Sequence, residues 1–257
     1  MKNIEIKILN PEAITNAEKM LVCAARLTQR GHSIKSLDDF MHLYEKGYSE
    51  NTVSTLSALP HTTIQKFGLI NVVIVGASRR FLAQITRHQN EVKFMSASLQ
   101  YSNYSGEADF VVPYKILESG DDVIDLYKLT NIFSMKEYAH VAESCDSDSA
   151  GYLAPQGLRN ILIISATPYQ WKYMIHQRVC RRNTDETRYI MLRIWEQLYV
   201  LSPALFSDCG PFCVSGPCKE GKMSCKNPIR KNTIPTDILK EDFPLLTGGL
   251  ENENKNN

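Results

Sequence analysis

The sequence predicts a single α+β domain, and three stretches of the chain carry that prediction. Residues 3–9 alternate apolar and polar side chains, which is typical of a half-buried strand. Residues 69–75 and 160–165 are short runs rich in β-branched residues and indicate buried strands. Long segments with helical periodicity separate the three. The 257 residues show no internal repeat and no clean linker, so one large domain is the simplest interpretation.

Helix signals account for most of the remaining chain. Pro11 suits a first helical turn, and Gly31 suits the end of the helix that follows over residues 13–30. Ser36 with Asp39 marks the start of a second helix, which extends to position 46. Further helices are expected at residues 52–59, 79–86, 121–143, 168–182 and 185–201, with strand and loop over 94–112.

The composition is that of an ordinary globular protein. Lys and Arg number 29 against 28 Asp and Glu, so the net charge of +1 does not favour a nucleic-acid coat or a membrane-surface protein. The beginning of the chain lacks the apolar core of a signal peptide, and the longest apolar run, residues 69–77, contains Asn71. We expect a cytoplasmic protein, with residues 250–257 disordered.

Seven cysteines are present, and four of them lie close together in the sequence. Cys209, Cys213, Cys218 and Cys225 have the spacing C-x3-C-x4-C-x6-C. Tetrahedral zinc takes four thiolates, but the usual pair of C-x-x-C motifs is absent. The odd total and a reducing compartment argue against a disulfide framework. A structural zinc site and unligated or redox-active thiols both remain open.

Two clusters of cations stand out beside predicted helix ends. Cations at a helix C-terminus can complement its dipole, for about 0.3–1 kcal/mol each. Arginine can also hold a phosphate through two parallel hydrogen bonds, so an anion site is the competing interpretation. The first cluster is Arg79, Arg80, Arg87 and His88; the second is Arg178, Arg181 and Arg182, which share one face if the helix extends to position 182.

Other catalytic motifs are weak or missing. Ser98 has no Gly-x-Ser-x-Gly elbow around it and no evident Asp partner for a His, so a hydroxyl that binds a ligand is favoured over a nucleophile. The sequence contains neither a Walker A motif nor a Gly-x-Gly-x-x-Gly fingerprint.

Taken in order, four segments resemble the flavin-dependent thymidylate synthases. The first is PHTTIQKFGLINVVIVGASRRFLAQITRHQ at residues 60–89, which ends in Arg87-His88-Gln89. The others are SLQYS at 98–102, QRVCRRNTDETR at 177–188 and the Cys-rich segment at 210–225. The resemblance covers roughly residues 10–228, and the ordered set is more specific than any single piece.

The resemblance implies a fold, an assembly and a reaction. The expected fold is a central mixed or antiparallel sheet flanked by helices over residues 1–228, with the Cys-rich segment at 209–225 and a partly disordered tail at 229–257. The expected assembly is a homotetramer whose active sites are shared between subunits. The reaction would be reductive methylation of dUMP to dTMP, with methylenetetrahydrofolate, FAD and NADPH. A C5-modifying enzyme on another pyrimidine nucleotide, and a non-catalytic descendant that binds nucleotide or flavin, are the alternatives.

The resemblance also assigns roles to residues. Arg87, Arg178 and Ser98 would be catalytic, with Arg87 between flavin and nucleotide. The cofactor would contact Thr63, Arg87, His88, Gln89, Tyr173 and Arg182; the nucleotide would contact Gln84, Arg87, Ser98, Leu99, Gln100 and Arg178. Small molecules are therefore the expected partners, with no nucleic acid and no membrane.

Several positions depart from the family pattern. Arginines of the pattern are replaced by Gln89, Gln100, Gly151 and Tyr169, and one extra residue precedes Ser98. Each lost arginine that faces a phosphate would cost about 1–3 kcal/mol of binding unless another cation replaces it. Arg181 and Arg182 are the candidate replacements.

Overall fold

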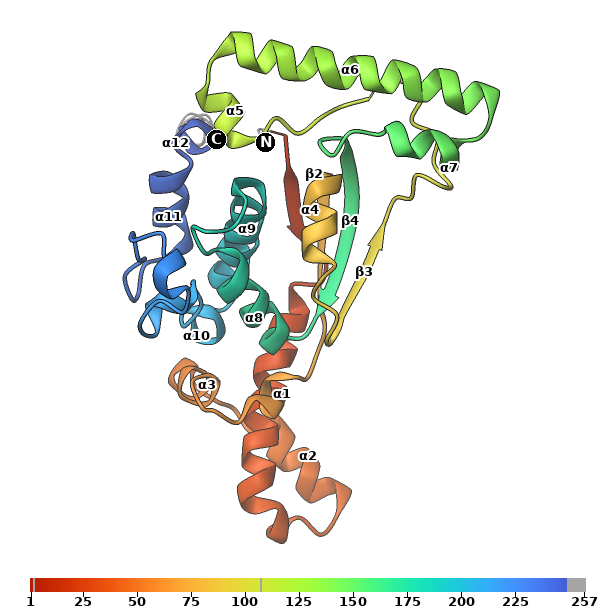
Figure 1. Ribbon diagram of the computed structural model, residues 1–257. Coiled ribbons are helices and arrows are strands. Elements are labelled where there is room, and N and C mark those ends of the chain that lie inside the picture. Colours follow the sequence, from red (N-terminus) through yellow and green to blue (C-terminus); the bar gives the residue numbers. More distant parts are fainter. Residues whose placement is uncertain (2, 107, 249–257) are drawn as a thin grey trace, which may run out of the picture.

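The computed structural model describes residues 1, 3–106 and 108–248, and it is built around one antiparallel sheet (Figure 1). The strands are β1 (Glu5–Ile8), β2 (Ile70–Ser78), β3 (Val92–Ser96) and β4 (Arg159–Ala166). Their order is β1-β2-β4-β3, and each neighbouring pair is antiparallel. The predicted α+β fold with a central mixed or antiparallel sheet is confirmed, and the sheet is antiparallel. The predicted disorder at 250–257 lies outside the described residues.

The two faces of the sheet differ in burial. Val72 pairs with Ile164 and Ile74 with Leu162, and all four side chains are buried in the main core. On the opposite face, Val75 pairs with Ile161, and the two remain 40% and 44% exposed. The two central strands were expected to be buried strands, but a single chain covers only one of their faces.

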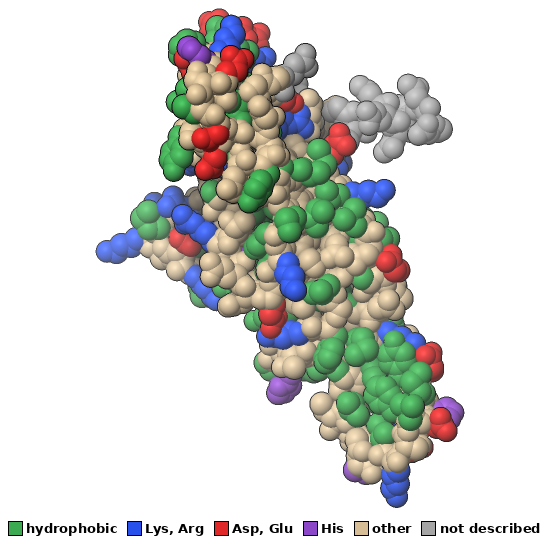
Figure 2. Space-filling model, turned by 90° about the vertical axis from the view of Figure 1, so that its right-hand side faces the viewer, with side chains coloured by type: hydrophobic (Ala, Val, Ile, Leu, Met, Phe, Trp, Pro, Cys, Tyr) green, Lys and Arg blue, Asp and Glu red, His purple; other side chains and the backbone are tan. Residues whose placement is uncertain are grey.

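The N-terminal helices follow the sequence signals closely. They are α1 (Glu12–Arg30), α2 (Leu37–Glu45) and α3 (Glu50–Ser57). Ser36 and Asp39 form the expected capping box, in which each side chain accepts a hydrogen bond from the other residue's backbone N–H. A hydrophobic patch covers the α1–α2 end of the molecule (Figure 2), where Leu27, Leu37 and Met41 are exposed.

Helix α9 (Asp185–Leu201) is central to the core, and Figure 1 shows it between the sheet and α11 (Pro235–Asp242). Ile190, Ile194 and Leu198 on α9 are fully buried. Ile238 on α11 and Phe243 just after it are fully buried as well. Residues 229–248 therefore complete the core, which corrects the prediction that a separate tail begins at 229.

Helix α8 (Pro168–Arg178) ends four residues earlier than predicted. Thr167 caps its start, and the backbone leaves the helix at Val179. The expected face with Arg178, Arg181 and Arg182 at helical spacing does not form. Within α8, Trp171 is fully buried, and its indole N–H donates a hydrogen bond of 3.1 Å to the carbonyl oxygen of Ile70. This bond connects α8 to β2.

The remaining helices are one long helix and several short ones. Long helix α6 (Asp121–Ser144) contributes Tyr138 to a small second apolar cluster that also includes Leu158. No helix within the described ranges is both long and apolar enough to cross a membrane. The other helices are α4 (Arg79–Ile85), α5 (Tyr114–Glu118), α7 (Ser147–Ala150), α10 (Pro203–Phe206) and α12 (Pro244–Thr247); short 3₁₀ turns are η1 (Gly31–Ser33), η2 (Thr62–Gln65), η3 (Gly151–Leu153), η4 (Phe212–Val214) and η5 (Gly221–Met223).

Candidate functional site

An open pocket of about 900 Å³ lies alongside α8 and beside the end of α4. Arg87 follows the end of α4, and Arg178 is the last residue of α8. The partial negative charge at a helix C-terminus favours a cation there. Both arginines line this one pocket, and they come to it from the ends of two separate helices. The pocket is lined by Lys66, Arg87, His88, Gln89, Asn90, Glu91, Tyr169, Gln170, Tyr173, Gln177 and Arg178.

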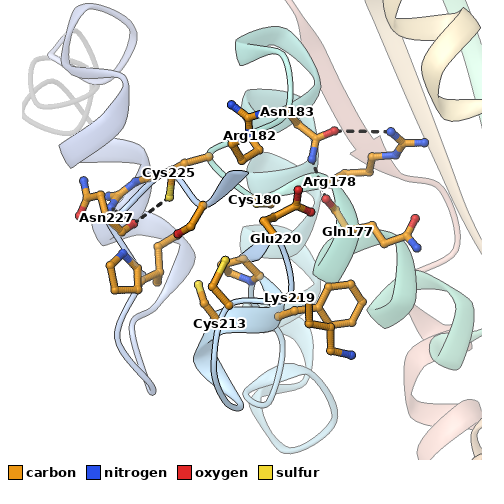
Figure 3. A pocket seen from close by; sticks show the side chains of 17 residues that line it. Gln177, Arg178, Cys180, Arg182, Asn183, Cys213, Lys219, Glu220, Cys225 and Asn227 are labelled. Atoms are coloured by element: carbon orange, nitrogen blue, oxygen red, sulfur yellow. Dashed lines mark hydrogen bonds between the residues drawn. The ribbon is translucent and has the colours of Figure 1, made fainter. Parts of the chain in front are cut away.

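The guanidinium of Arg178 is held from three sides. Nε donates to Nε2 of His88 at 2.8 Å, and Nη2 donates to the carbonyl oxygen of Gln84 at 2.8 Å. Nη1 also reaches Oδ1 of Asn183 at 3.5 Å, which Figure 3 shows as a dashed line. Burial, and then the charge of Arg87, lower the pKa of Arg178. The arginine is thus fixed in orientation before any ligand arrives.

His88 is a neutral partner of Arg178. Its side chain is 6% exposed, and burial together with the Arg178 charge lowers the pKa of His88 to about 4. At neutral pH the imidazole is uncharged, and its Nε2 accepts the hydrogen bond from Arg178. Tyr173 packs edge-on against the ring at 6.2 Å between centroids. His88 lies in the pocket lining as expected, but this geometry makes it a support for Arg178.

Two predicted ligand contacts lie away from this pocket. The Oε1 atom of Gln84 accepts hydrogen bonds from Thr184 at 2.9 Å and Thr187 at 2.7 Å, so the side chain is directed toward the start of α9. Its backbone carbonyl, rather than its amide group, serves the site by orienting Arg178. Thr63 lies exposed in η2 and does not line the pocket.

Ser98, Leu99 and Gln100 lie past the opposite end of β3 from Gln89. Ser98 Oγ accepts a hydrogen bond of 3.1 Å from the backbone N–H of Gln100. Leu99 packs onto the α6 cluster, and Gly151 lies directly against it. Within one chain, the structure therefore does not bring this segment to the pocket of Arg87 and Arg178.

A second pocket of about 290 Å³ lies between the end of α8 and the Cys-rich segment (Figure 3). Gln177 and Arg178 line both pockets. Arg182, predicted to bind the cofactor, lines only this second pocket. Arg181 pairs with Glu241 at 2.7 Å and with Asp242 at 2.9 Å. Its guanidinium is therefore committed to α11, which argues against its predicted role as a replacement phosphate ligand.

The cysteines are arranged differently from the predicted quartet. Cys180 joins Cys213, Cys218 and Cys225 in lining the second pocket. Cys209 is buried elsewhere, and this burial raises the pKa of its thiol. All seven cysteines carry free thiols. In the part of the chain that the structure describes, no three His, Cys, Asp or Glu side chains lie close enough to hold a metal ion, so the zinc interpretation is not supported.

Sequence reasoning missed one pair that lines the first pocket. Lys66 Nζ lies 2.7 Å from Oε1 of Glu91 and 5.1 Å from the ring centroid of Tyr169. These three residues come from three different elements, and no spacing in the sequence connects them. The only signal in the sequence is Tyr169 itself, which departs from the family pattern.

Both the sequence and the fold are similar to those of known proteins. A family model described as thymidylate synthase complementing protein matches residues 12–204. A flavin-dependent thymidylate synthase from Geobacter sulfurreducens is 22% identical over 66% of this chain and 73% of its own length. One from Clostridium tetani is 22% identical over 87% of this chain and 94% of its own.

Two solved structures share the fold. A UMP/dUMP methylase from Streptomyces cacaoi, bound with 5-Br dUMP, superposes with a TM-score of 0.61 at 12% identity, covering 80% of this chain and 94% of that one. Thymidylate synthase X from Helicobacter pylori, with FAD and dUMP, superposes with a TM-score of 0.59 at 13% identity, covering 80% and 98%. At such identities the likeness establishes the fold alone.

Proposed function

Because the chain belongs to the thymidylate synthase complementing protein family, whose model covers residues 12–204, we propose that it catalyses flavin-dependent methylation of dUMP to dTMP. Methylenetetrahydrofolate would supply the carbon, and FAD reduced by NADPH would supply the hydride. The observation that carries the proposal is the pair of guanidinium groups, Arg87 and Arg178, in one pocket. Solved structures of this fold that contain dUMP or FAD support it by analogy.

The pocket residues fit a flavin and a nucleotide chemically. The cavity of about 900 Å³ is within the usual size range of small-molecule sites. Tyr169 and Tyr173 offer aromatic surfaces, and Lys66, Arg87 and Arg178 offer positive charge to phosphate groups. FAD, when bound here, would supply hydride chemistry, and the protein would supply binding and orientation.

Arg178 is the residue placed best to act on the pyrimidine. Its guanidinium is already oriented by His88 and by the carbonyl of Gln84, so no reorganisation is needed when charge develops on a substrate oxygen. Neutral His88 accepts a hydrogen bond from Arg178 and carries no charge of its own, so the positive charge stays on the guanidinium. Arg87 is exposed and free to contact flavin, nucleotide or both.

We also propose that the active enzyme is a homotetramer in which a second copy completes each site. The uncovered sheet face carries Val75, Ile161, Ile163 and Met95, which are 40%, 44%, 39% and 72% exposed. Apolar surface of this kind marks association sites. Ser98 and Gln100 would then reach the pocket of a neighbouring subunit. Light scattering of the purified protein tests this directly: a monomer at micromolar concentration would contradict it.

The catalytic proposal is tested by flavin absorbance and by tritium release from C5-labelled dUMP. We expect a yellow protein whose flavin spectrum changes when dUMP is added. Arg178→Ala should abolish tritium release, while Arg30→Ala, which removes an exposed arginine at another helix end, should leave it unchanged. Turnover of UMP or dCMP in preference to dUMP would favour the related C5-modifying activity. A colourless protein that releases no tritium from dUMP would refute the proposal.

A further inference from the structure

Lys66 is a pocket residue held by two neighbours of different kinds. Its ammonium lies 2.7 Å from the Glu91 carboxylate and 5.1 Å from the Tyr169 ring centroid. The Glu91 partner raises the pKa of Lys66, so this side chain is charged at neutral pH. The lysine side chain is 35% exposed and remains accessible to a ligand in the pocket. A cation is therefore presented at a fixed place in the pocket wall.

The pocket has a positive charge at each end of α8. Tyr169 is near the start of this helix and Arg178 is its last residue. Nine residues at about 1.5 Å rise each separate the two positions by about 14 Å. Lys66 lies over Tyr169, so it marks the end of the pocket opposite to Arg178. The N-terminal end of a helix also carries partial positive charge, which adds to the attraction for an anion at the Lys66 end.

The charges along the pocket are unbalanced. Among the described lining residues, Lys66, Arg87 and Arg178 are cations, and Glu91 is the one acidic side chain. His88 contributes no charge at neutral pH. Glu91 is in the left-handed region, with φ of 57°, which a residue with a side chain adopts only at some cost. The turn before β3 thus holds a carboxylate against Lys66 despite its conformational cost.

We propose that Lys66 binds a phosphate group of FAD, with the isoalloxazine toward Arg178. This inference rests on the proposed function. A ligand must be extended to span both ends of α8, and FAD is the proposed ligand with phosphates far from its reactive ring. Tyr169 stands where the family resemblance predicts an arginine that holds the flavin. Lys66, which directly follows η2, places its ammonium over the Tyr169 ring. It thus supplies positive charge at the position of Tyr169.

The experiment compares flavins with and without phosphate. Apo-protein is titrated with FAD and with riboflavin, and flavin fluorescence reports the Kd. We expect Lys66→Gln to weaken FAD binding about tenfold and to leave riboflavin and dUMP binding unchanged, because it removes one charge-assisted hydrogen bond to phosphate. Lys66→Arg should keep most of the FAD affinity. Glu91→Gln should tighten FAD binding several-fold, because it removes the carboxylate that competes for Lys66.

The chain offers a closely matched control. Lys19 pairs with Glu45 at 2.9 Å and lies 3.9 Å from the Tyr44 ring centroid, so it repeats the same three residue types outside the pocket. Lys19→Gln should leave FAD affinity unchanged. In the Lys66→Gln background, Tyr169→Arg should restore FAD binding by returning a cation to that end of the pocket.

The possible failures are distinguishable. If the wild-type protein binds no FAD at all, the proposed function and this inference both fall. If wild type binds FAD and Lys66→Gln binds it equally well, only the role of Lys66 is refuted. Equal weakening of riboflavin and FAD would show a general loss of pocket structure and would refute phosphate recognition, as would weakening of dUMP binding alone.

Discussion

The burial of His88 makes a quantitative prediction about stability and pH. An ordinary histidine has a pKa of 6.5, whereas burial and Arg178 lower that of His88 to about 4. At about 1.4 kcal/mol per pKa unit, this difference corresponds to about 3–4 kcal/mol of unfolding free energy. The unfolded chain binds the proton more readily, so the contribution is fully present above pH 6.5. It is lost as the pH falls from 6.5 through 4.

The measurement is urea unfolding between pH 7.5 and 4.5, for the wild type and for His88→Gln. A glutamine oxygen can still accept the hydrogen bond from Arg178, but it does not titrate. We expect the wild type to lose stability steeply below pH 6.5, and the variant to lose it with a shallower slope. The comparison between pH 6.5 and 5 is the most informative, because most carboxylates remain ionised there.

His176 requires its own control, since burial also lowers its pKa. Proton–nitrogen NMR of the imidazoles separates the two histidines directly, with His176→Gln used for assignment. If the His88 ring titrates near 6.5, or if the wild type and His88→Gln have parallel pH profiles, then His88 is not the buried neutral partner of Arg178 inferred above.

Two further substitutions test the supports around the site. Asp242→Asn should lower the unfolding free energy by about 3–5 kcal/mol, because it leaves Arg181 and buried Arg188 without their shared carboxylate; a urea midpoint equal to that of the wild type would contradict this. Ser78→Ala should cost about 2–3 kcal/mol by thermal unfolding, because Ser78 both caps α4 and donates to buried Glu186. A loss below 1 kcal/mol would refute this dual role of Ser78.

The strands were predictable from sequence, but the exposure of their second face was not. Val73 and Val75 alternate with Val72 and Ile74, so the run looks like a strand buried on both faces. In the single chain one of those faces is partly open. A sequence pattern records every surface that becomes buried, including surface buried between subunits. The disagreement between pattern and single chain is therefore itself support for the proposed assembly.

The convergence of Arg87 and Arg178 could be anticipated only because the order of motifs resembled a family. Without the resemblance, dipole compensation is the favoured explanation for both arginines. The neutral state of His88 depends on burial, which no local sequence signal specifies. The Lys66–Glu91 pair depends on the approach of η2's loop to the turn before β3, and these are 25 positions apart in the chain. Such contacts follow from topology.

The end of α8 shows how a tertiary contact can determine ligand chemistry. Residues 179–182 contain no helix breaker, so the sequence predicts a helix that continues to 182. In the fold, Arg181 is drawn toward α11 by Glu241, Asp242 and the carbonyl of Asn227. A continuous helix would place Arg181 beside Arg178 on one face and add its positive charge there. Because the helix ends at Arg178, the Arg178 guanidinium lines the pocket, whereas the Arg181 guanidinium binds the carboxylates of α11. The charge that the departures remove must then come from elsewhere, and Lys66, over the Tyr169 ring, is the cation that the described pocket lining offers besides Arg87 and Arg178.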